Sequence, residues 1–434
     1  MKRPPPPPGP DPLEGDGPAA PGAGGPWDVL ILGGGAAGLW AAGTAAQRGR
    51  RVLLLEKNRR VGVKILASGG GACNLTTTLT AREAAHWFRR AGERFLGPAF
   101  RALSPQDLRA AFEALGVPTS SEPELEKVWP VSRRAHDVAA ALLTRARRAG
   151  ARVLTSSPVT GLARTPSGFA VTTPSGGVQA PRVLLAVGGL SYARTGTTGD
   201  GYAWLEGLGH TLTPLAPALA PLVVERPWVR ALSGIALDVE ARAVSADGRL
   251  LLARRRPLLF THTGLSGPAA MDVSRWFDLP TPPEGPPRLL LDLLPGRDEA
   301  EVRAELDAAI ASGARAPAWR ALPAALPERL RRGLCEERGV DPMRPAGTLT
   351  REERHGLVSA LKRLELPVVG TRGYDHAEVT AGGVALDEID PGSMESRLVP
   401  GLFVAGELLD LDGPIGGFSF QAAFATAELA GRVL

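Results

Sequence analysis

The chain has 434 residues, of which 44% are apolar and 22% are charged, and its formal net charge is +5. This composition is typical of a globular protein, and the length indicates two or three domains. No run of about 18 to 20 apolar residues predicts a membrane helix, and the N-terminal segment lacks the apolar core of a signal peptide, so we expect a cytoplasmic protein without a membrane partner. The two cysteines, Cys73 and Cys335, have neither disulfide nor zinc-site spacing, so no metal is predicted.

The first residues differ in composition from the rest of the chain. Residues 1–25 are rich in proline and glycine and predict a disordered tail. From Trp27 onward, "WDVLIL" and "RRVLLLEKN" contain unbroken apolar runs, and an alanine-rich helical stretch separates them. Unbroken apolar strands on either side of a helix are typical of a parallel sheet. The sequence therefore predicts an α/β fold.

Further changes of composition divide the remaining chain. Helical spacing dominates residues 80–148, and short strand patterns follow it. Residues 211–295 contain many short β-like runs separated by proline and glycine, residues 297–365 return to helical spacing, and the C-terminal segment reads as strand, glycine turn and helix. We therefore expect a discontinuous nucleotide-binding domain at 26–204 and 367–434, and an inserted substrate-side domain at 205–366 that contains a β-barrel and helices.

The first glycine-rich turn, "GGGAAG", lies between the two predicted strands. Gly33, Gly35 and Gly38 form a G-x-G-x-x-G pattern, which permits a tight turn, close approach of a pyrophosphate and close packing of helix on strand. The start of the helix, at Ala36 and Ala37, supplies unpaired N–H groups and partial positive charge. In this strand, helix, strand context the pattern predicts a three-layer, Rossmann-like domain that binds FAD or NAD(P).

An acidic residue, Glu56, closes the second strand eighteen residues after Gly38. Its carboxylate is placed to accept a hydrogen bond from the adenosine ribose. An acid at this position favours NAD or FAD over NADP, whose ribose carries a phosphate. The neighbouring Lys57 is also predicted to bind the cofactor.

The second glycine-rich turn, Ser68 to Gly71, distinguishes FAD from NAD. An NAD-dependent dehydrogenase does not need a second such turn. A protein that binds FAD does, because it must also contact the long ribityl chain and the flavin ring along the edge of the sheet. The sequence therefore predicts FAD, with contacts from Lys64, Gly70, Gly71, Cys73 and Asn74.

The stretch "VGVKILASGGGACNLT" resembles the corresponding segment of the HI0933-like, or BaiN-type, flavoproteins, which reads roughly G-x-K-x-x-x-S-G-x-G-R-C-N. Further family motifs match "VWPVSRRAHDVAAAL", "LLAVGGLSYARTGTTGDGY", "LLFTHTGLSGPA" and the segment from "AEVTAGGVAL" to "FQAAFATA", in order between Asp28 and Arg432. Ala72 departs from the family, which usually has arginine there. The resemblance implies a bound FAD and reduction of a conjugated double bond, or oxidation of a small amine or related donor, with members assigned to bile-acid or steroid-like substrates.

The C-terminal motif also predicts cofactor contacts. A strand from Leu402 to Ala405 ends at Gly406 and Glu407, and Glu407 is placed to bind a ribityl hydroxyl. A turn follows, and two glycines open the final helix, whose N-terminus would stabilise negative charge on reduced flavin. Asp412, Gly416 and Gly417 of this motif are also predicted contacts. Gly188, which follows the predicted strand in "PRVLLAVGG", is another.

Two residues are candidates for the chemistry. Tyr192 follows a strand that reaches the cofactor edge, and it could donate a proton or act as a lid. His262, in the inserted domain, could act as a general acid. For each, simple structural packing is the alternative, and a redox role for Cys73 is disfavoured because no resolving cysteine is near in the sequence.

The sequence therefore predicts an FAD-dependent oxidoreductase that transfers a hydride through flavin N5. We expect NAD(P)H to visit the flavin transiently as electron donor, because no second dinucleotide pattern exists, and a small organic molecule with a conjugated double bond to be reduced. An oxygen-using amine oxidase, an FAD-containing protein that binds or modifies RNA, and a binding protein with structural FAD are the alternatives. No nucleic-acid partner is expected, because the basic residues are scattered and the Arg254–Arg256 run reads as a solvated hairpin or turn.

Overall fold

The computed structural model describes residues 11–17, 20, 22 and 25–434. The chain forms two compact units, one made of residues up to Leu215 together with Glu378–Leu434, the other of Ala216–Ala377. Both boundaries lie further along the chain than 205 and 366. Helix α7 (Asp200–Gly207) explains the first difference, because Leu205 is fully buried in the core of the first unit.

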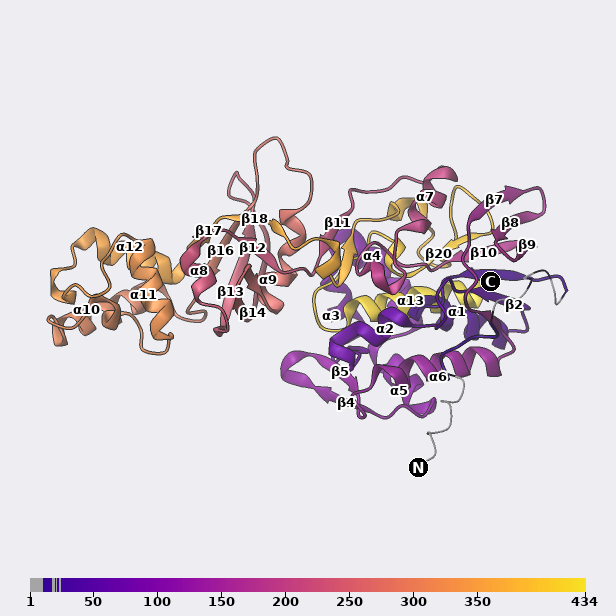
Figure 1. The fold of residues 1–434 in the computed structure, drawn as a ribbon, viewed down its shortest axis with the longest axis horizontal. Helices are drawn as coiled ribbons and strands as arrows, with labels where there is room; N and C mark the ends of the chain where they lie inside the picture. The colour runs from indigo at the N-terminus through magenta and orange to yellow at the C-terminus, as the bar shows by residue number, and fades with distance from the viewer. Residues whose placement is uncertain (1–10, 18–19, 21, 23–24) are drawn as a thin grey trace, which may run out of the picture. The chain divides into compact units, whose positions relative to one another are not determined.

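A parallel sheet of five strands forms the centre of the first unit (Figure 1). Its order is β20-β10-β1-β2-β6, and Val29 of β1 is in register with Val52 of β2 and Arg182 of β10. Because the chain leaves β1 for β2 on one side and returns to β10 on the other, the carboxyl end of β1 is a topological switch point, where such sheets bind ligands. The strands are β1 (Val29–Leu32), β2 (Val52–Leu55), β6 (Arg152–Leu154), β10 (Arg182–Leu185) and β20 (Leu402–Val404).

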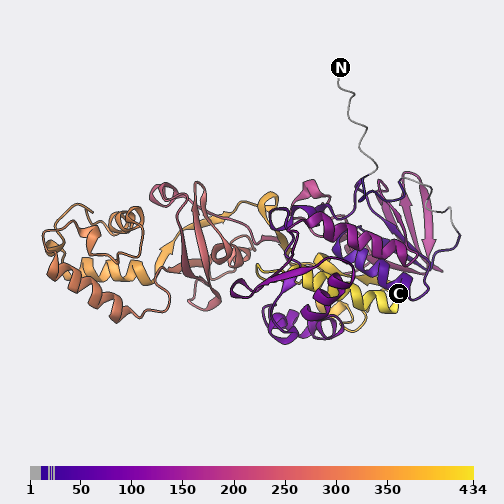
Figure 2. The same cartoon turned by 90° about the horizontal axis from the view of Figure 1, so that it is seen from below.

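Two further layers cover this sheet, which confirms the predicted three-layer α/β fold. Helix α1 packs between α6 and α13 and contacts β1 and β2, while β8 and β9 contact β10 and β1 (Figures 1 and 2). The helical layer consists of α1 (Ala36–Gln47), α6 (Ala135–Arg148) and α13 (Phe418–Val433). The antiparallel layer consists of β7 (Gly161–Thr165), β8 (Gly168–Thr173) and β9 (Gly176–Ala180).

Smaller elements complete the first unit. Helices α3 and α5 begin with capping boxes in which the side chains of Thr80 and Ser104 accept backbone N–H groups. These elements are α2 (Val63–Ala67), β3 (Thr76–Thr77), α3 (Ala81–His86), α4 (Arg90–Ala102), α5 (Pro105–Ala114), β4 (Thr119–Glu122), β5 (Lys127–Pro130) and β19 (Val379–Ala381).

Part of the predicted tail packs onto this unit. Leu13 is 1% exposed and belongs to the hydrophobic core. Asp11, Glu14 and Asp16 form ion pairs with three arginines of the unit, Arg60, Arg59 and Arg147. Residues 11–17 therefore depart from the expected disordered tail, because one leucine and three carboxylates anchor them, whereas residues 1–10 lie outside the described part of the chain.

The second unit contains an antiparallel sheet in the order β17-β16-β13-β14-β15-β12-β18. Its two edge strands, β17 and β18, are consecutive in the chain and only Pro367 separates them. Proline lacks an N–H group and interrupts the strand there, so one chain segment provides both edges of this antiparallel sheet. Closure of the sheet into the expected barrel stays a prediction. The strands of this sheet are β12 (Leu222–Val224), β13 (Ala236–Val244), β14 (Leu250–Thr261), β15 (Gly264–Ser266), β16 (Arg288–Asp292), β17 (Leu364–Leu366) and β18 (Val368–Thr371), and β11 (Ala216–Ala218) lies outside it.

A helical part follows β16, as the spacing over 297–365 predicts. Helices α10, α11 and α12 bury Val302, Leu334 and Leu357 in the core of the second unit. The Arg254–Arg256 run lies within β14, which pairs with β13 in a hairpin, so the expected hairpin is found. Arg254 departs from the expected solvated run, because its strand faces the core there and it is buried beside Asp272. The helices are α8 (Pro227–Ala231), α9 (Pro268–Asp272), α10 (Glu299–Ser312), α11 (Glu328–Glu337) and α12 (Arg351–Lys362).

Among the described residues, no helix has the length and apolar character needed to cross a membrane. The same residues contain no cluster of histidine, cysteine and acidic side chains that could hold a metal ion.

Candidate functional site

The first glycine-rich turn lies at the carboxyl end of β1. Gly33 has a φ of +103°, and a Cβ there would lie 2.5 Å from the carbonyl oxygen of Ala186. A Cβ at Gly38 would lie only 1.9 Å from the carbonyl oxygen of Gly33, so the helix packs against the turn as the pattern predicts. Gly35 differs from both, because a Cβ there would meet no atom within 4 Å. The turn is thus tight on the side of the sheet and open at Gly35.

Helix α1 begins at this open position. Gly35 is its N-cap, and in this fully described helix no side chain caps the N-terminus and no acidic residue lies in the first turn. The first N–H groups of a helix have no partner within the helix, and they carry partial positive charge. The backbone at Ala36 and Ala37 is therefore suited to bind an anion such as a pyrophosphate.

Glu56 lies beside this turn at the end of β2. It is 7% exposed, and its two carboxylate oxygens accept hydrogen bonds from the N–H groups of Gly34, at 2.6 Å, and Asn58, at 2.8 Å. Burial raises the pKa of Glu56, although both backbone hydrogen bonds act in the opposite direction. An ionised carboxylate has about four acceptor positions, so these two bonds still leave capacity for a ribose hydroxyl.

Lys57 and Asn58 join this strand end to the loop that precedes α7. The Lys57 ammonium donates to Thr198 Oγ1 at 2.5 Å and to Asp200 Oδ2 at 2.6 Å. The Asn58 amide donates to the carbonyl oxygen of Thr195 at 3.1 Å. Lys57 therefore acts within this structure as a link between two loops of the predicted cofactor edge.

The second glycine-rich turn has a different geometry from the first. Gly69, Gly70 and Gly71 all have positive φ, at +55°, +66° and +92°. A Cβ at Gly69 would lie 2.8 Å from the indole ring of Trp129, but a Cβ at Gly70 would meet no atom within 4 Å and one at Gly71 only the carbonyl oxygen of Leu66, at 4.0 Å. This turn therefore also has an open side, which Gly70 and Gly71 provide.

Cys73 and Asn74 follow this turn with structural contacts. Cys73 is fully buried, has a φ of +56°, and burial raises the pKa of its thiol to about 12. Asn74 Oδ1 accepts a hydrogen bond from the N–H of Val128 at 3.1 Å, which holds the turn against β5. The thiol is thus protonated at neutral pH, which argues against a redox role.

Glu407 is the centre of a polar network in the first unit. Its Oε2 pairs with Lys64 Nζ at 2.5 Å, and its Oε1 accepts from Ser191 Oγ and from the Thr380 N–H, both at 2.9 Å. Lys64 also donates to Ser191 Oγ at 2.6 Å. Two predicted contacts, Lys64 and Glu407, therefore lie together, although they are 343 residues apart in the chain.

Asp412 lies in a second charged group, with a residue that the sequence did not single out. Asp410 and Asp412 both pair with Arg89, the N-cap of α4. Nearby, Gly417 is the N-cap of α13, has a φ of +89°, and a Cβ there would lie 2.5 Å from the carbonyl oxygen of Thr76. The ion pairs hold the turn that leads into α13, so this helix starts against β3.

The other predicted glycines adopt conformations that suit glycine. Gly188, Gly406 and Gly416 have positive φ of +78°, +75° and +139°. A Cβ at Gly188 would lie 2.7 Å from Thr197 Cγ2, and one at Gly406 would lie 3.2 Å from Ala37 Cβ. Gly406 therefore brings the end of β20 close to the start of α1.

The two predicted catalytic residues lie in different units. Tyr192 is half-buried, has a φ of +54°, and its ring lies 5.7 Å from the guanidinium carbon of Arg194. His262 is exposed in the turn between β14 and β15. Their catalytic roles stay predictions.

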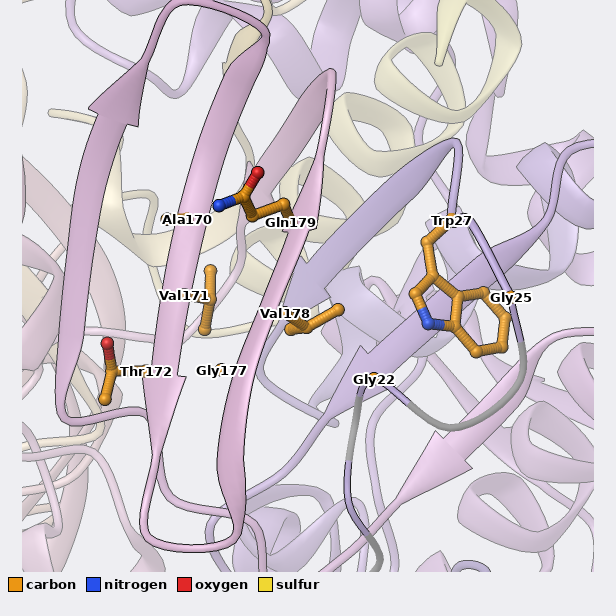
Figure 3. A pocket seen from close by; sticks show the side chains of 9 residues that line it. All are labelled: Gly22, Gly25, Trp27, Ala170, Val171, Thr172, Gly177, Val178 and Gln179. Carbon is orange, nitrogen blue, oxygen red and sulfur yellow. The ribbon is translucent and has the colours of Figure 1, made fainter.

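A hollow of about 450 Å³ lies elsewhere in the first unit (Figure 3). Trp27, Gly22 and Gly25 form one wall, and residues of β8 and β9 form the other. None of the residues that line it belongs to the predicted cofactor site, so the hollow is not evidence for that site.

The sequence patterns do not single out Ser191, Thr380 or Arg89. Ser191 and Thr380 lie within quoted motifs, but which partner each one binds depends on the tertiary structure. Arg89 had no local signal, because it is one arginine in a helical stretch that contains several.

The arrangement fits an FAD molecule. Gly35, Gly70 and Gly71 leave open space where side chains would otherwise stand, and the uncapped start of α1 supplies N–H groups for a pyrophosphate. Glu56 has remaining acceptor capacity for the ribose. Lys64 and Glu407 provide polar groups further along the same unit.

Comparison with known proteins agrees with this arrangement. The model of the HI0933-like protein Rossmann domain matches residues 27–433. The chain is 32% identical over 410 residues to a 3-dehydro-bile acid delta(4,6)-reductase of Clostridium scindens, which covers 93% of this chain and 98% of that protein. It is also 30% identical to a ribosomal RNA dihydrouridine synthase of Escherichia coli and 31% identical to one of Haemophilus influenzae, in each case over 92% of this chain and 96% of the relative. The chain therefore belongs to the HI0933-like family and is an FAD-dependent oxidoreductase.

Proposed function

We propose that this protein reduces a carbon–carbon double bond conjugated to a carbonyl group in a small organic substrate, with NAD(P)H as the electron donor. The observation that carries this proposal is the similarity to the bile acid delta(4,6)-reductase, which extends over 93% of the chain. Bound FAD supplies hydride transfer through its N5 atom.

The proposal gives each candidate residue a role. The start of α1, at Gly35, binds the pyrophosphate, and Glu56 accepts a hydrogen bond from the ribose. Lys64 and Glu407 hold the flavin end through the network that also includes Ser191. The first N–H groups of α13, after Gly417, would supply partial positive charge that stabilises the negative charge of a reduced flavin. Tyr192 and His262 are the candidates to deliver the proton that completes reduction of the double bond.

The test begins with the purified, FAD-loaded protein in the absence of oxygen. Addition of NADH or NADPH should bleach the flavin absorbance, and a conjugated ketosteroid should restore it, with formation of the saturated product. Failure of both nicotinamides to bleach the flavin would contradict the proposed donor. Bleaching by an amine, with hydrogen peroxide released when air is admitted, would show an oxidase instead.

A second candidate function is reduction of uridine in ribosomal RNA. Two full-length relatives are named ribosomal RNA dihydrouridine synthases, which favours this function. The C5–C6 bond of uracil is itself conjugated to a carbonyl group, so the same chemistry serves both substrates. This candidate conflicts with the expectation of no nucleic-acid partner, and it predicts formation of dihydrouridine in ribosomal RNA but no turnover of the ketosteroid.

A further inference from the structure

Three arginines surround one tryptophan in the helical part of the second unit. The guanidinium carbons of Arg320, Arg331 and Arg332 lie 5.3, 4.8 and 5.0 Å from the centre of the Trp319 ring. All three distances are within the range of a cation–π interaction. We call these four residues the Trp319 cluster; Trp319 lies just before α11, and Arg331 and Arg332 lie in its first half.

The positive charge of the cluster is only partly neutralised. Glu328 pairs with Arg332, through Nε at 2.8 Å and through the terminal nitrogen at 2.7 Å. Among the described residues of the second unit, no carboxylate forms an ion pair with Arg320 or Arg331. Burial lowers the pKa of Arg331, Glu328 opposes that change, and the nearby Arg320 lowers the pKa further.

Two buried donors in the cluster have no acceptor. Trp319 is 7% exposed, and its indole N–H is buried without a hydrogen-bond partner among the described residues. The Nε–H of Arg331 is also buried without a hydrogen-bond partner among the described residues. A buried donor without an acceptor is unfavourable, so the cluster offers donors that an oxygen-rich anion would satisfy.

The chemistry of the cluster is suited to phosphate. A guanidinium group presents its N–H donors in a planar fork that matches two phosphate oxygens. Arg320 is exposed and Arg331 and Arg332 are half-buried, so the group is reachable from solvent. The chain has a formal charge of +5, which favours a polyanion over a neutral partner.

We propose that the Trp319 cluster binds the phosphate backbone of RNA and thereby anchors an RNA substrate on the second unit. This inference rests on the second candidate function, reduction of uridine in ribosomal RNA. It adds a binding site that is separate from the residues predicted to hold FAD.

The test measures binding of a fluorescently labelled, single-stranded RNA to the full-length, FAD-loaded protein across a series of salt concentrations. The variant Arg320→Gln, Arg331→Gln, Arg332→Gln should bind at least about tenfold more weakly. Loss of three phosphate contacts should also reduce the slope of log affinity against log salt by about 2, at about 0.7 for each contact to a single strand.

A matched control removes the same charge elsewhere on the helical part. Arg315, Arg338 and Arg351 are exposed, so the variant Arg315→Gln, Arg338→Gln, Arg351→Gln should retain most of the affinity. Equal losses in the two triple variants would overturn the proposal, because the effect would then follow net charge. A triple Arg→Lys variant of the cluster should keep most of the salt dependence, since lysine also binds phosphate as a point charge.

Additional measurements separate this inference from the proposed function and from misfolding. Circular dichroism and flavin content should match between the variants and the wild type, and a salt dependence preserved in the Arg→Lys variant supports a charge contact even if the Gln variant is unstable. RNA binding and dihydrouridine formation that persist unchanged in the cluster variant would overturn the inference alone. No RNA binding by any form would overturn the second candidate function as well. Binding of inorganic phosphate at the cluster, without any effect on RNA affinity, would show a small-anion site and contradict the RNA proposal.

Discussion

The two glycine-rich turns of the first unit use glycine for different reasons. In the first turn, Gly33 and Gly38 are required because a Cβ would collide with backbone oxygens at 2.5 and 1.9 Å. In the second turn, Gly69, Gly70 and Gly71 all have positive φ. Most residues other than glycine avoid this conformation, and asparagine and aspartate tolerate it best. Packing alone excludes a side chain at Gly38, and packing and a positive φ together exclude one at Gly33, whereas at Gly70 and Gly71 only the backbone conformation favours glycine.

Gly35 fits neither explanation. Its φ is −82°, which every residue adopts, and a Cβ there would meet no protein atom within 4 Å. Neither strain nor packing in the protein requires glycine at this position. The fold of the protein therefore does not require glycine at Gly35. This is the position where a ligand is expected to approach the backbone.

The largest effect should come from Gly38→Ala. The added Cβ would lie 1.9 Å from the Gly33 carbonyl oxygen, so helix α1 must move away from β1. We expect the free energy of unfolding to fall by about 3 kcal/mol or more. Urea denaturation of the protein without FAD measures this change, and a loss below about 1 kcal/mol would show that the turn relaxes and that packing does not determine glycine here.

Gly35→Ala should leave the stability almost unchanged and weaken the binding of FAD. The stability of the FAD-free protein should stay within about 0.5 kcal/mol of wild type, because the methyl group points into open space. FAD affinity should fall by about tenfold or more, because that methyl group occupies the approach to the start of α1. Fluorescence titration with FAD measures the affinity, and unchanged affinity would contradict the predicted pyrophosphate position.

The sequence was sufficient for features that depend on local spacing. Unbroken apolar runs identified β1 and β2, and the spacing from Gly33 to Gly38 identified the turn between β1 and α1. Both follow from short-range rules for strands and turns. The helical part of the second unit was also predicted, because its α-helical spacing extends over several turns.

Features that depend on the tertiary structure were not predictable. The Lys64 to Glu407 pair joins residues far apart in the chain, and no pattern in either segment shows that they meet. The predicted boundary at 205 was placed at a change in composition, but burial of Leu205 keeps helix α7 in the first unit. Leu13 shows the same limitation, because a single apolar residue in a proline-rich segment gives no periodic signal.

Gly70→Ala should have a smaller effect on stability than Gly38→Ala. Alanine at a φ of +66° costs about 1 to 2 kcal/mol of backbone strain, while its Cβ meets no atom within 4 Å. Gly70→Asn is the matched control, because asparagine tolerates this conformation and should lose less stability. If both variants are equally stable and both bind FAD normally, then neither backbone strain nor cofactor approach accounts for glycine at this position.

The smallest effect should be at Cys73, which continues the second turn with a φ of +56° but carries a side chain that faces the core. Burial raises the pKa of its thiol, and that of Cys335, to about 12. Because a thiol reacts as the thiolate, neither cysteine should be alkylated by iodoacetamide in the native protein at pH 8, and both should react once the chain is unfolded. Mass spectrometry counts the modified sites. Rapid alkylation of Cys73 but not Cys335 in the FAD-free native protein would show that the second turn opens locally and would contradict this prediction, whereas protection of both would show that both thiols stay buried in the native protein.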